Sequence, residues 1–218
     1  FPTRRSSDLA LIGQGNFFAF QEHSTDELLG PTRGTDWDDF GTWRKIHLHA
    51  TDGAHNQIFD TWNGLNGALF QATLVAEKST GAAQLEGKFL RAWAYRNLTI
   101  AFGGVPILAG PVTEPKVDFT RNTAAECYDF IKKDLEFARL NLPITTTITG
   151  KAVRSAADHL LAEIYIILKD YPSSIAAATR VIDGTDGAYS LMNTRFGARK
   201  AETMTTRGTP TDYYWDLH

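Results

Sequence analysis

The sequence predicts an all-α fold in which helices alternate with long irregular loops. Apolar residues recur at spacings of three and four over several stretches, which is the periodicity of a helix with one buried face. Glycine and proline gather between these stretches, where they end helices and form turns. A third observation is a helix-start signature, in which Thr123 is followed three residues later by Glu126.

We expect the fold to be organised around residues 85–112, LEGKFLRAWAYRNLTIAFGGVPILAGPV. This segment begins as a helix with a broad apolar face, which is typical of a central core helix. Gly103 and Gly104 end the helix, and Pro106 fixes an extended exit. We expect Trp93 and Tyr95 to serve packing rather than ligand binding. Two adjoining rows form the face: Leu85, Phe89, Ala92, Trp93 and Ile100, and then Leu90, Ala94, Leu98 and Ala101.

A second helix is predicted over residues 55–78, and Ser79-Thr80-Gly81 ends it. Gly64 and Gly67 either weaken this helix or allow another helix to approach it closely. Its apolar stripe consists of Ile58, Trp62, Leu65, Leu69, Ala72 and Val75.

A third helix is predicted from the capping box at Thr123 to Leu142, where Pro143 stops it. The extended linker 111–121 precedes it. The apolar stripe of this helix consists of Cys127, Phe130, Ile131, Leu135, Ala138 and Leu142.

Residues 151–184 predict two more helices, joined at Lys169-Asp170-Tyr171. Their pattern, AEIYIILKDYPSSIAAATRVI, resembles a tetratricopeptide helix pair. Units of this kind cannot bury their apolar faces alone, so we expect them to pack on each other or on further sequence. The first helix is expected to bury Ala156, Leu160, Leu161, Ile164, Tyr165 and Leu168, and the second Ile175, Ala178, Val181 and Ile182.

Residues 10–54 are predicted to be a loop, because they lack helical periodicity and are punctuated by Pro31, Gly34 and Gly41. A long loop in a compact domain is usually either functional or disordered. Large aromatic side chains argue against disorder, since they need burial or a ligand. Those in this loop include Trp37, Phe40 and Trp43.

The composition argues against several classes of function. The formal net charge is -3, with no basic patch or tail, which argues against a nucleic-acid partner. No run approaches eighteen apolar residues, so the sequence predicts no membrane-spanning helix. Cys127 is the single cysteine, which excludes an intrachain disulfide and a multi-cysteine metal site.

Taken together, the order and spacing of several segments resemble the SusD/RagB family of nutrient-binding outer-membrane lipoproteins. No segment is specific alone, but the set covers nearly everything from residue 20 onward. The resemblance implies a SusD-like helical scaffold with tetratricopeptide-like helix pairs and long irregular loops. The segments are STDELLGPTRGTDWDD, FDTWNGLNGAL, EGKFLRAWAYRNLTIAFGGVPIL, TAAECYDFIKKDLEFARLNLP, GKAVRSAADHLLAEIYIILKDYPSSIAAATRVIDG and YYWDLH.

The resemblance also implies a function, which is to bind and not to catalyse. Such proteins are lipid-anchored at the outer face of the outer membrane of Bacteroidota-type bacteria. They lie over a SusC-like TonB-dependent channel and capture glycans, or sometimes peptides, for import. The implied partners are therefore that channel and an oligosaccharide, with no cofactor, no nucleic acid, and membrane attachment only through a lipid anchor.

Family members are considerably longer, so we expect this chain to be an N-terminal portion. Residues 1–9, FPTRRSSDL, match a translated sequencing adapter, and we expect them to be an artefact. Residues 10–218 are then expected to be an incomplete SusD-like domain, with the signal peptide and anchor outside the sequence. Its expected parts are an aromatic loop region at 10–54, a helix pair at 55–110, helices at 122–184 that include the tetratricopeptide-like pair, and a truncated loop at 185–218.

We predict the ligand-binding residues within TRGTDWDDFGTW. Sugar rings stack their C–H faces on aromatic planes, while their hydroxyls need carboxylate, amide or guanidinium partners. The alternative is a structural loop whose tryptophans fill the core of the scaffold. The predicted binding residues are Trp37, Asp38, Trp43, Arg33 and Asp36.

The carboxylates on this loop leave two alternatives to a glycan-binding site open, a calcium site and a glycosidase active site. Asp36, Asp38 and Asp39 could hold calcium, although the full calcium-loop spacing is absent. A glycosidase needs two carboxyls that face each other across the substrate. Asp36 and Asp38 are too close in sequence for that unless the loop folds back sharply.

Other candidate residues have simpler explanations. His47 and His49, with His55 nearby, could lie on one side of a strand as metal ligands, but no fourth ligand stands out and a hydrogen-bonded pair is favoured. Cys127 is expected to be a buried, inert thiol. Tyr213, Tyr214 and Trp215 could line a glycan platform, although packing is favoured.

The competing function is a helical-repeat scaffold that binds a protein surface. The aromatic loop before the first predicted helix separates the two functions, because a plain repeat scaffold rarely carries such an appendage.

Overall fold

The computed structural model describes residues 17–30, 34, 38–108, 110–112, 119–148, 150–187 and 189. Within these residues the secondary structure is entirely helical, which confirms the all-α prediction. No helix of the described part is both long and apolar enough to cross a membrane. The elements are α2 (Phe17–His23), the short 3-10 helix η1 (Asp39–Gly41), α3 (Thr42–His47), α4 (Asn56–Lys78), α5 (Gly81–Phe102), α6 (Ala124–Asn141), α7 (Arg154–Ile167) and α8 (Tyr171–Ile182).

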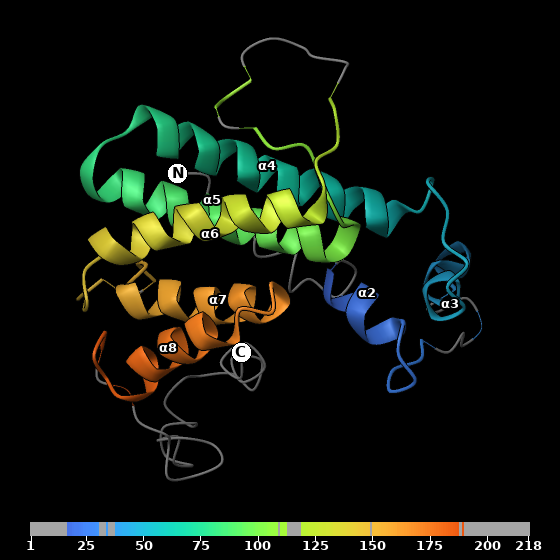
Figure 1. Cartoon of the computed structure of the whole chain (residues 1–218). Coiled ribbons are helices and arrows are strands. Elements are labelled where there is room, and N and C mark those ends of the chain that lie inside the picture. Colours follow the sequence, from blue (N-terminus) through green and yellow to red (C-terminus); the bar gives the residue numbers. More distant parts are fainter. Residues whose placement is uncertain are drawn as a thin grey trace, which may run out of the picture.

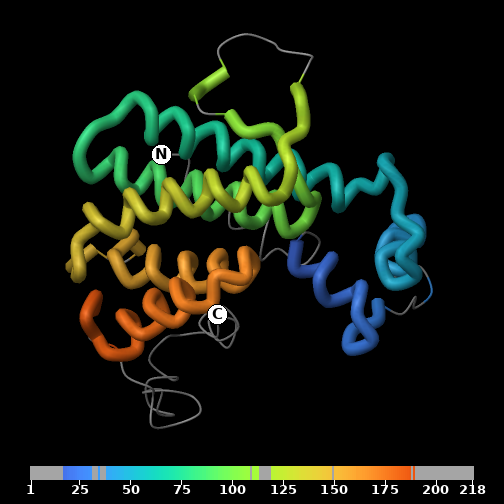
Figure 2. Tube along the Cα trace, viewed as in Figure 1, coloured from blue at the N-terminus to red at the C-terminus, as the bar shows by residue number. Residues whose placement is uncertain are grey.

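Helices α4 to α8 form a stack in which each helix packs against the next one in the chain (Figures 1 and 2). Helix α5 lies between α4 and α6, as expected for the central helix. The shared core lies where α4 to α8 meet, and nothing comparable in size forms among the described residues outside it. Helices α2 and α3 lie to one side of the stack, with α3 near the start of α4 and α2 between α3 and the stack (Figure 1).

Helix α5 has the predicted central role but a narrower buried face than its sequence suggests. Tyr95 and Leu98 are fully buried, whereas Leu90 is 41% exposed and Ile100 is 38% exposed. Ala101 is also exposed. The reason is geometric: α4 and α6 cover two sides of α5, and the residues pointing between them reach solvent.

The predicted Gly-Gly-Val-Pro corner ends α5 and directs the chain toward α6. Gly103 caps the helix at a φ of 73°, and its N–H donates to the Thr99 carbonyl. Gly104 lies so close to the start of α6 that a Cβ atom there would be 2.0 Å from the Asn122 carbonyl oxygen. The Tyr95 hydroxyl accepts a hydrogen bond of 2.7 Å from the Leu108 N–H, which fixes the extended exit.

A buried ion pair joins α4, α5 and α6. Arg91, on α5, is 2% exposed. Its guanidinium donates to both carboxylate oxygens of Asp134 on α6, at 2.6 and 3.0 Å. A third bond of 2.8 Å reaches Glu77 on α4. This bidentate geometry satisfies the buried charges, so the three helices are held in one register.

Helices α4 and α5 approach each other closely at a glycine that the sequence analysis did not single out. A Cβ atom on Gly87 would lie 2.6 Å from the Ala76 backbone nitrogen. Gly67, proposed above as a site of close approach, has no neighbouring atom within 4 Å of such a Cβ. The small residue that permits helix contact is therefore on α5 and not at Gly67 of α4.

Helix α6 confirms the capping-box prediction. The Thr123 hydroxyl accepts from the Glu126 N–H, and the Glu126 carboxylate accepts from the Thr123 N–H at 2.7 Å. Of the predicted stripe, Phe130 is only partly buried, while five residues are buried: Cys127, Ile131, Leu135, Ala138 and Leu142. The Cys127 thiol is enclosed beside Val105, as expected for an inert cysteine.

The tetratricopeptide-like pair forms α7 and α8 with the predicted joint. The predicted buried face of α8 is wrong for Ile175 and Ile182, whereas Ala178 and Val181 are partly buried. Ile175 is 66% exposed and Ile182 is 76% exposed. Helix α8 instead packs on α7 through Ser174 and Ala177, because small residues let the two helices approach. Helix α8 is the outermost helix of the described stack, so its larger apolar residues face away from α7.

The prediction of loop over residues 10–54 is also wrong in part, since α2 and α3 lie within it. These helices have seven and six residues, which is too short for a 3.6-residue period to be visible. Short helices are unstable alone and need tertiary packing. Here that packing comes from a small core of Ala19, Trp43 and Ile46.

Breaking the buried ion pair should destabilise the whole stack. We expect Arg91→Met to lower the free energy of unfolding by about 3–5 kcal/mol, because Asp134 would remain buried without its bidentate partner. The double variant Arg91→Met with Asp134→Leu should lose clearly less, since both buried charges are removed and the charges that lose a partner, Glu77 and Lys88, are less deeply buried. Urea unfolding followed by circular dichroism measures both, and equal losses would contradict this role of the pair.

Two glycine substitutions should have opposite effects. Gly87→Ala should destabilise the chain by about 1–3 kcal/mol, because the new methyl group meets the α4 backbone. Gly67→Ala should stabilise it by about 0.5–1 kcal/mol, since alanine is the better helix former and space is free. Thermal unfolding of the two variants beside the unchanged chain is the test, and a stable Gly87→Ala protein would refute the close approach.

Candidate functional site

The predicted site lies in a small unit that we call the N-terminal lobe, residues 17–30 and 38–55. Its helices α2 and α3 contact each other, and α3 contacts η1, more than either contacts the α4–α8 stack. Among the described residues, the link to α4 includes His55, whose Nε2 lies 3.2 Å from the Thr42 carbonyl oxygen. The lobe is thus a separate small structure carried on the end of the scaffold.

The turn between Asp38 and Thr42 has an unusual backbone. Three consecutive residues have positive φ angles: 37° at Asp39, 57° at Phe40 and 77° at Gly41. Glycine adopts this region freely, but a left-handed conformation costs other residues roughly 1–2 kcal/mol each. The side chain of Phe40 is also 96% exposed. The lobe therefore holds a strained turn with an aromatic ring in solvent.

Trp43 lies beneath this turn and supports it. Its side chain is buried, at 6% exposure, and its indole N–H donates to the Asp39 carboxylate at 2.5 Å. The His23 ring packs against the indole with a centroid separation of 5.2 Å. In this structure Trp43 therefore fills the core of the lobe, as in the structural alternative considered above, and stacking a sugar on it would require the side chain to move.

Asp38 is the predicted site residue that the structure describes at the surface. Its carboxylate accepts a hydrogen bond of 3.2 Å from the Arg44 guanidinium, and the two side chains are 46% and 58% exposed. Both acceptor and donor atoms are thus presented to solvent beside the turn. The remaining predicted site residues, Arg33, Asp36 and Trp37, lie outside the described residues, as do Tyr213, Tyr214 and Trp215.

The histidines do not lie on a strand as the metal-ligand alternative required. His47 ends α3, and His49 follows it in a turn. Within the described ranges, no group of three or more His, Cys, Asp or Glu side chains is arranged to hold a metal ion. The Nδ1 atoms of His23, His47 and His55 are instead buried, without a hydrogen-bond partner in this part of the chain.

A second polar cluster, far from the lobe, has a structural role. Asp158 on α7 is fully buried and accepts bonds of 2.8 Å from Arg139 and 3.0 Å from Arg180. Asp186, in the turn after α8, pairs with Arg139 at 3.2 Å and with Arg154 at 3.4 Å. Burial is the main reason that the pKa of Asp158 is raised. The cluster ties the end of α8 to α6 and α7.

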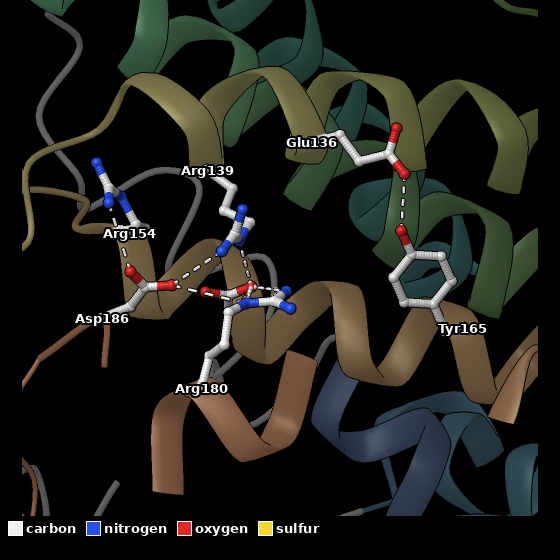
Figure 3. Close-up of polar contacts among 7 residues, drawn as sticks. Glu136, Arg139, Arg154, Tyr165, Arg180 and Asp186 are labelled. Atoms are coloured by element: carbon white, nitrogen blue, oxygen red, sulfur yellow. Dashed lines mark hydrogen bonds and ion pairs between the residues drawn. The ribbon is translucent and has the colours of Figure 1, made fainter. Parts of the chain in front are cut away.

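The Tyr165 hydroxyl makes a separate link between α7 and α6, donating to Glu136 at 2.7 Å (Figure 3). Burial and the nearby Glu136 carboxylate raise the pKa of Tyr165 well above its ordinary value. The phenol therefore stays protonated and serves as a hydrogen-bond donor between the two helices.

Comparison with known proteins places the chain in a family. A family model described as "Starch-binding associating with outer membrane" matches residues 52–166, more than half of the chain. The chain belongs to the SusD-like family. This match confirms the resemblance to SusD/RagB proteins, although it begins after the strained turn of the N-terminal lobe. No curated protein sequence matches the chain.

Several solved SusD-like structures share the fold. A SusD-like protein from Bacteroides fragilis has 24% identity and a TM-score of 0.68, over 87% of this chain and 38% of that one. A laminarin-binding SusD-like protein has 19% identity and a TM-score of 0.71, with 82% and 41% covered. A structure with xylogluco-oligosaccharide has 17% identity and a TM-score of 0.64, with 85% and 38% covered. The chain spans about two fifths of the length of these relatives.

Two surface residues beside the turn, Phe40 and Arg44, were not among the predicted ligand-binding residues. Phe40 was named only as one of several aromatics in the loop, and Arg44 was not singled out. The sequence gives one local signal, which is that Phe40 precedes Gly41 in a segment rich in turn formers. The exposure of the ring and the ion pair with Asp38 depend on the tertiary structure.

The N-terminal lobe should lose stability in acid. Burial, with a smaller contribution from His47, holds the pKa of His23 below its ordinary value of 6.5. His23 therefore binds a proton more readily in the unfolded lobe than in the folded lobe. The stability that neutral His23 contributes is fully present above the unfolded pKa of about 6.5. It is lost as the pH falls from there through the pKa of His23 in the folded lobe.

Hydrogen exchange of α2 and α3, compared at pH 7.5 and 5.5 after correction for intrinsic rates, tests this expectation. Protection should decrease at the lower pH, and His23→Gln should remove much of the difference. His159→Gln is the matched control, because that side chain is 70% exposed. Equal protection of the unchanged lobe at both pH values would contradict the prediction.

Proposed function

We propose that this chain is the glycan-binding part of a non-catalytic, nutrient-capturing lipoprotein at the bacterial outer-membrane surface. The observation that carries the proposal is the match of residues 52–166 to a family described as starch-binding and associated with the outer membrane. Two structural neighbours support it, one named for laminarin and one containing a xylogluco-oligosaccharide. In this proposal the bound glycan passes to a SusC-like TonB-dependent channel.

The proposed binding surface is the segment from Arg33 to Trp43. The Asp38 carboxylate lies at the surface, where its oxygens could accept hydrogen bonds from sugar hydroxyls. Trp43 holds the turn in place from below. Arg33, Asp36 and Trp37 remain part of the proposal on the chemistry of their side chains. The α4–α8 stack would serve as the support, because a buried ion pair and a continuous core hold its helices together.

The geometry of the described carboxylates supports binding rather than hydrolysis. A glycosidase places two carboxyls on opposite sides of the scissile bond, about 5–10 Å apart. Asp38 and Asp39 are adjacent in the chain, and each already has a partner, Arg44 and Trp43 respectively. This arrangement presents polar groups to a ligand without forming a facing acid–base pair.

One observation favours a second candidate function, a scaffold that binds a protein surface. Helix α8 exposes three large apolar side chains, Tyr171, Ile175 and Ile182, at 56%, 66% and 76%. Apolar residues gathered on one helix are typical of a surface covered by another polypeptide. The two functions are compatible if the lobe binds glycan while α8 packs on protein.

Affinity gel electrophoresis against laminarin, xyloglucan and starch tests the glycan proposal. We expect retarded migration in at least one polysaccharide, and Asp38→Ala should weaken the interaction about three- to tenfold, since one charged hydrogen bond is lost. Asp60→Asn, on an exposed position of α4, should have no effect. Unretarded migration in all three gels would count against glycan binding and leave the scaffold function.

A further inference from the structure

Phe40 combines two features that folding alone does not favour. Its side chain is 96% exposed, so the ring gains nothing from burial in the described structure. Its backbone has a φ of 57°, in the left-handed region that large side chains rarely adopt. Strained, exposed residues of this kind often mark positions where a ligand is held.

The turn is braced from below, so the ring projects from a fixed base. The Asp39 carboxylate accepts from the indole of Trp43 at 2.5 Å, and its carbonyl accepts from the Thr42 hydroxyl at 2.6 Å. The Gly41 N–H donates a hydrogen bond of 2.5 Å to the Asp38 carbonyl oxygen, which closes the turn. Because Trp43 itself is buried, these bonds connect the exposed turn to the core of the lobe.

The surroundings of the ring suit a sugar better than a protein surface. The described residues beside Phe40 in the chain are polar or glycine: Asp38, Asp39, Gly41 and Thr42. A protein interface requires a broad contact surface, whereas a sugar ring requires one aromatic plane with hydrogen-bonding groups at its edge. The exposed Asp38–Arg44 pair supplies an acceptor and a donor nearby.

We propose that Phe40 is the stacking platform of the glycan site and that it binds a pyranose ring through an uninterrupted C–H face, as in glucose. Asp38 and Arg44 hydrogen-bond the hydroxyls at the edge of that ring. Trp43 is the positioning residue that holds the turn. This inference rests on the proposed glycan-binding function and names the residue that performs it.

The test measures polysaccharide affinity and thermal stability of the whole chain in the same variants. Phe40→Gly should weaken binding about tenfold, or by about 1.4 kcal/mol. The polysaccharide used is the one that retards the unchanged chain. The same variant should unfold at an equal or higher temperature, because glycine relieves the left-handed strain. Phe40→Trp should retain binding within about threefold.

Phe59→Ala is the matched control, since Phe59 is 59% exposed but lies on α4. It should bind as the unchanged chain does. Wild-type affinity in Phe40→Gly would overturn the platform while leaving glycan binding intact. A lower unfolding temperature of Phe40→Gly would also overturn it, because the ring would then be structural. If the unchanged chain binds none of laminarin, xyloglucan and starch, the proposed function fails and the platform with it.

Discussion

The buried contact of Arg91 with Asp134 is the interaction on which the rest of the scaffold depends. It brings two charges into the centre of the stack, where burial makes an unpaired charge costly, and Asp134 also accepts from Lys88 at 3.3 Å. The guanidinium fork fixes direction as well as distance, and its third bond extends the constraint to Glu77. Helices α4, α5 and α6 are therefore aligned by a polar contact as well as by apolar packing.

The corner after α5 transmits this alignment to the remainder of the chain. Gly104 allows the chain to pass against the start of α6, and Tyr95 fixes the exit from inside the core. The charged cluster around Asp158 then joins α6 to α7 and α8. Each successive helix is thus attached to the previous one by a specific polar contact, which makes the stack a rigid support.

The N-terminal lobe follows a different physical principle. Its core consists of only a few side chains, and the buried Nδ1 atoms of its histidines have no hydrogen-bond partner among the described residues. Small cores contribute little stability, so the lobe belongs to the less stable part of the molecule. The left-handed backbone of Phe40 lowers the stability of the lobe further. A well-connected stack that carries a strained lobe is consistent with the proposal that the stack supports and the lobe binds the ligand.

The sequence by itself determined the five long helices, the capping box at Thr123, the corner at Gly103 and the buried position of Cys127 on its helix stripe, because each depends on local spacing or local chemistry. The tertiary structure decided what spacing cannot encode. Ile175 and Ile182 have helical periodicity yet remain exposed, since no described neighbour covers that face of α8. Helices α2 and α3 are too short for a visible period and form because Trp43 of α3 packs against α2. Phe40 and Trp43 have similar chemistry in sequence, but only packing decides that one ring is buried and the other exposed.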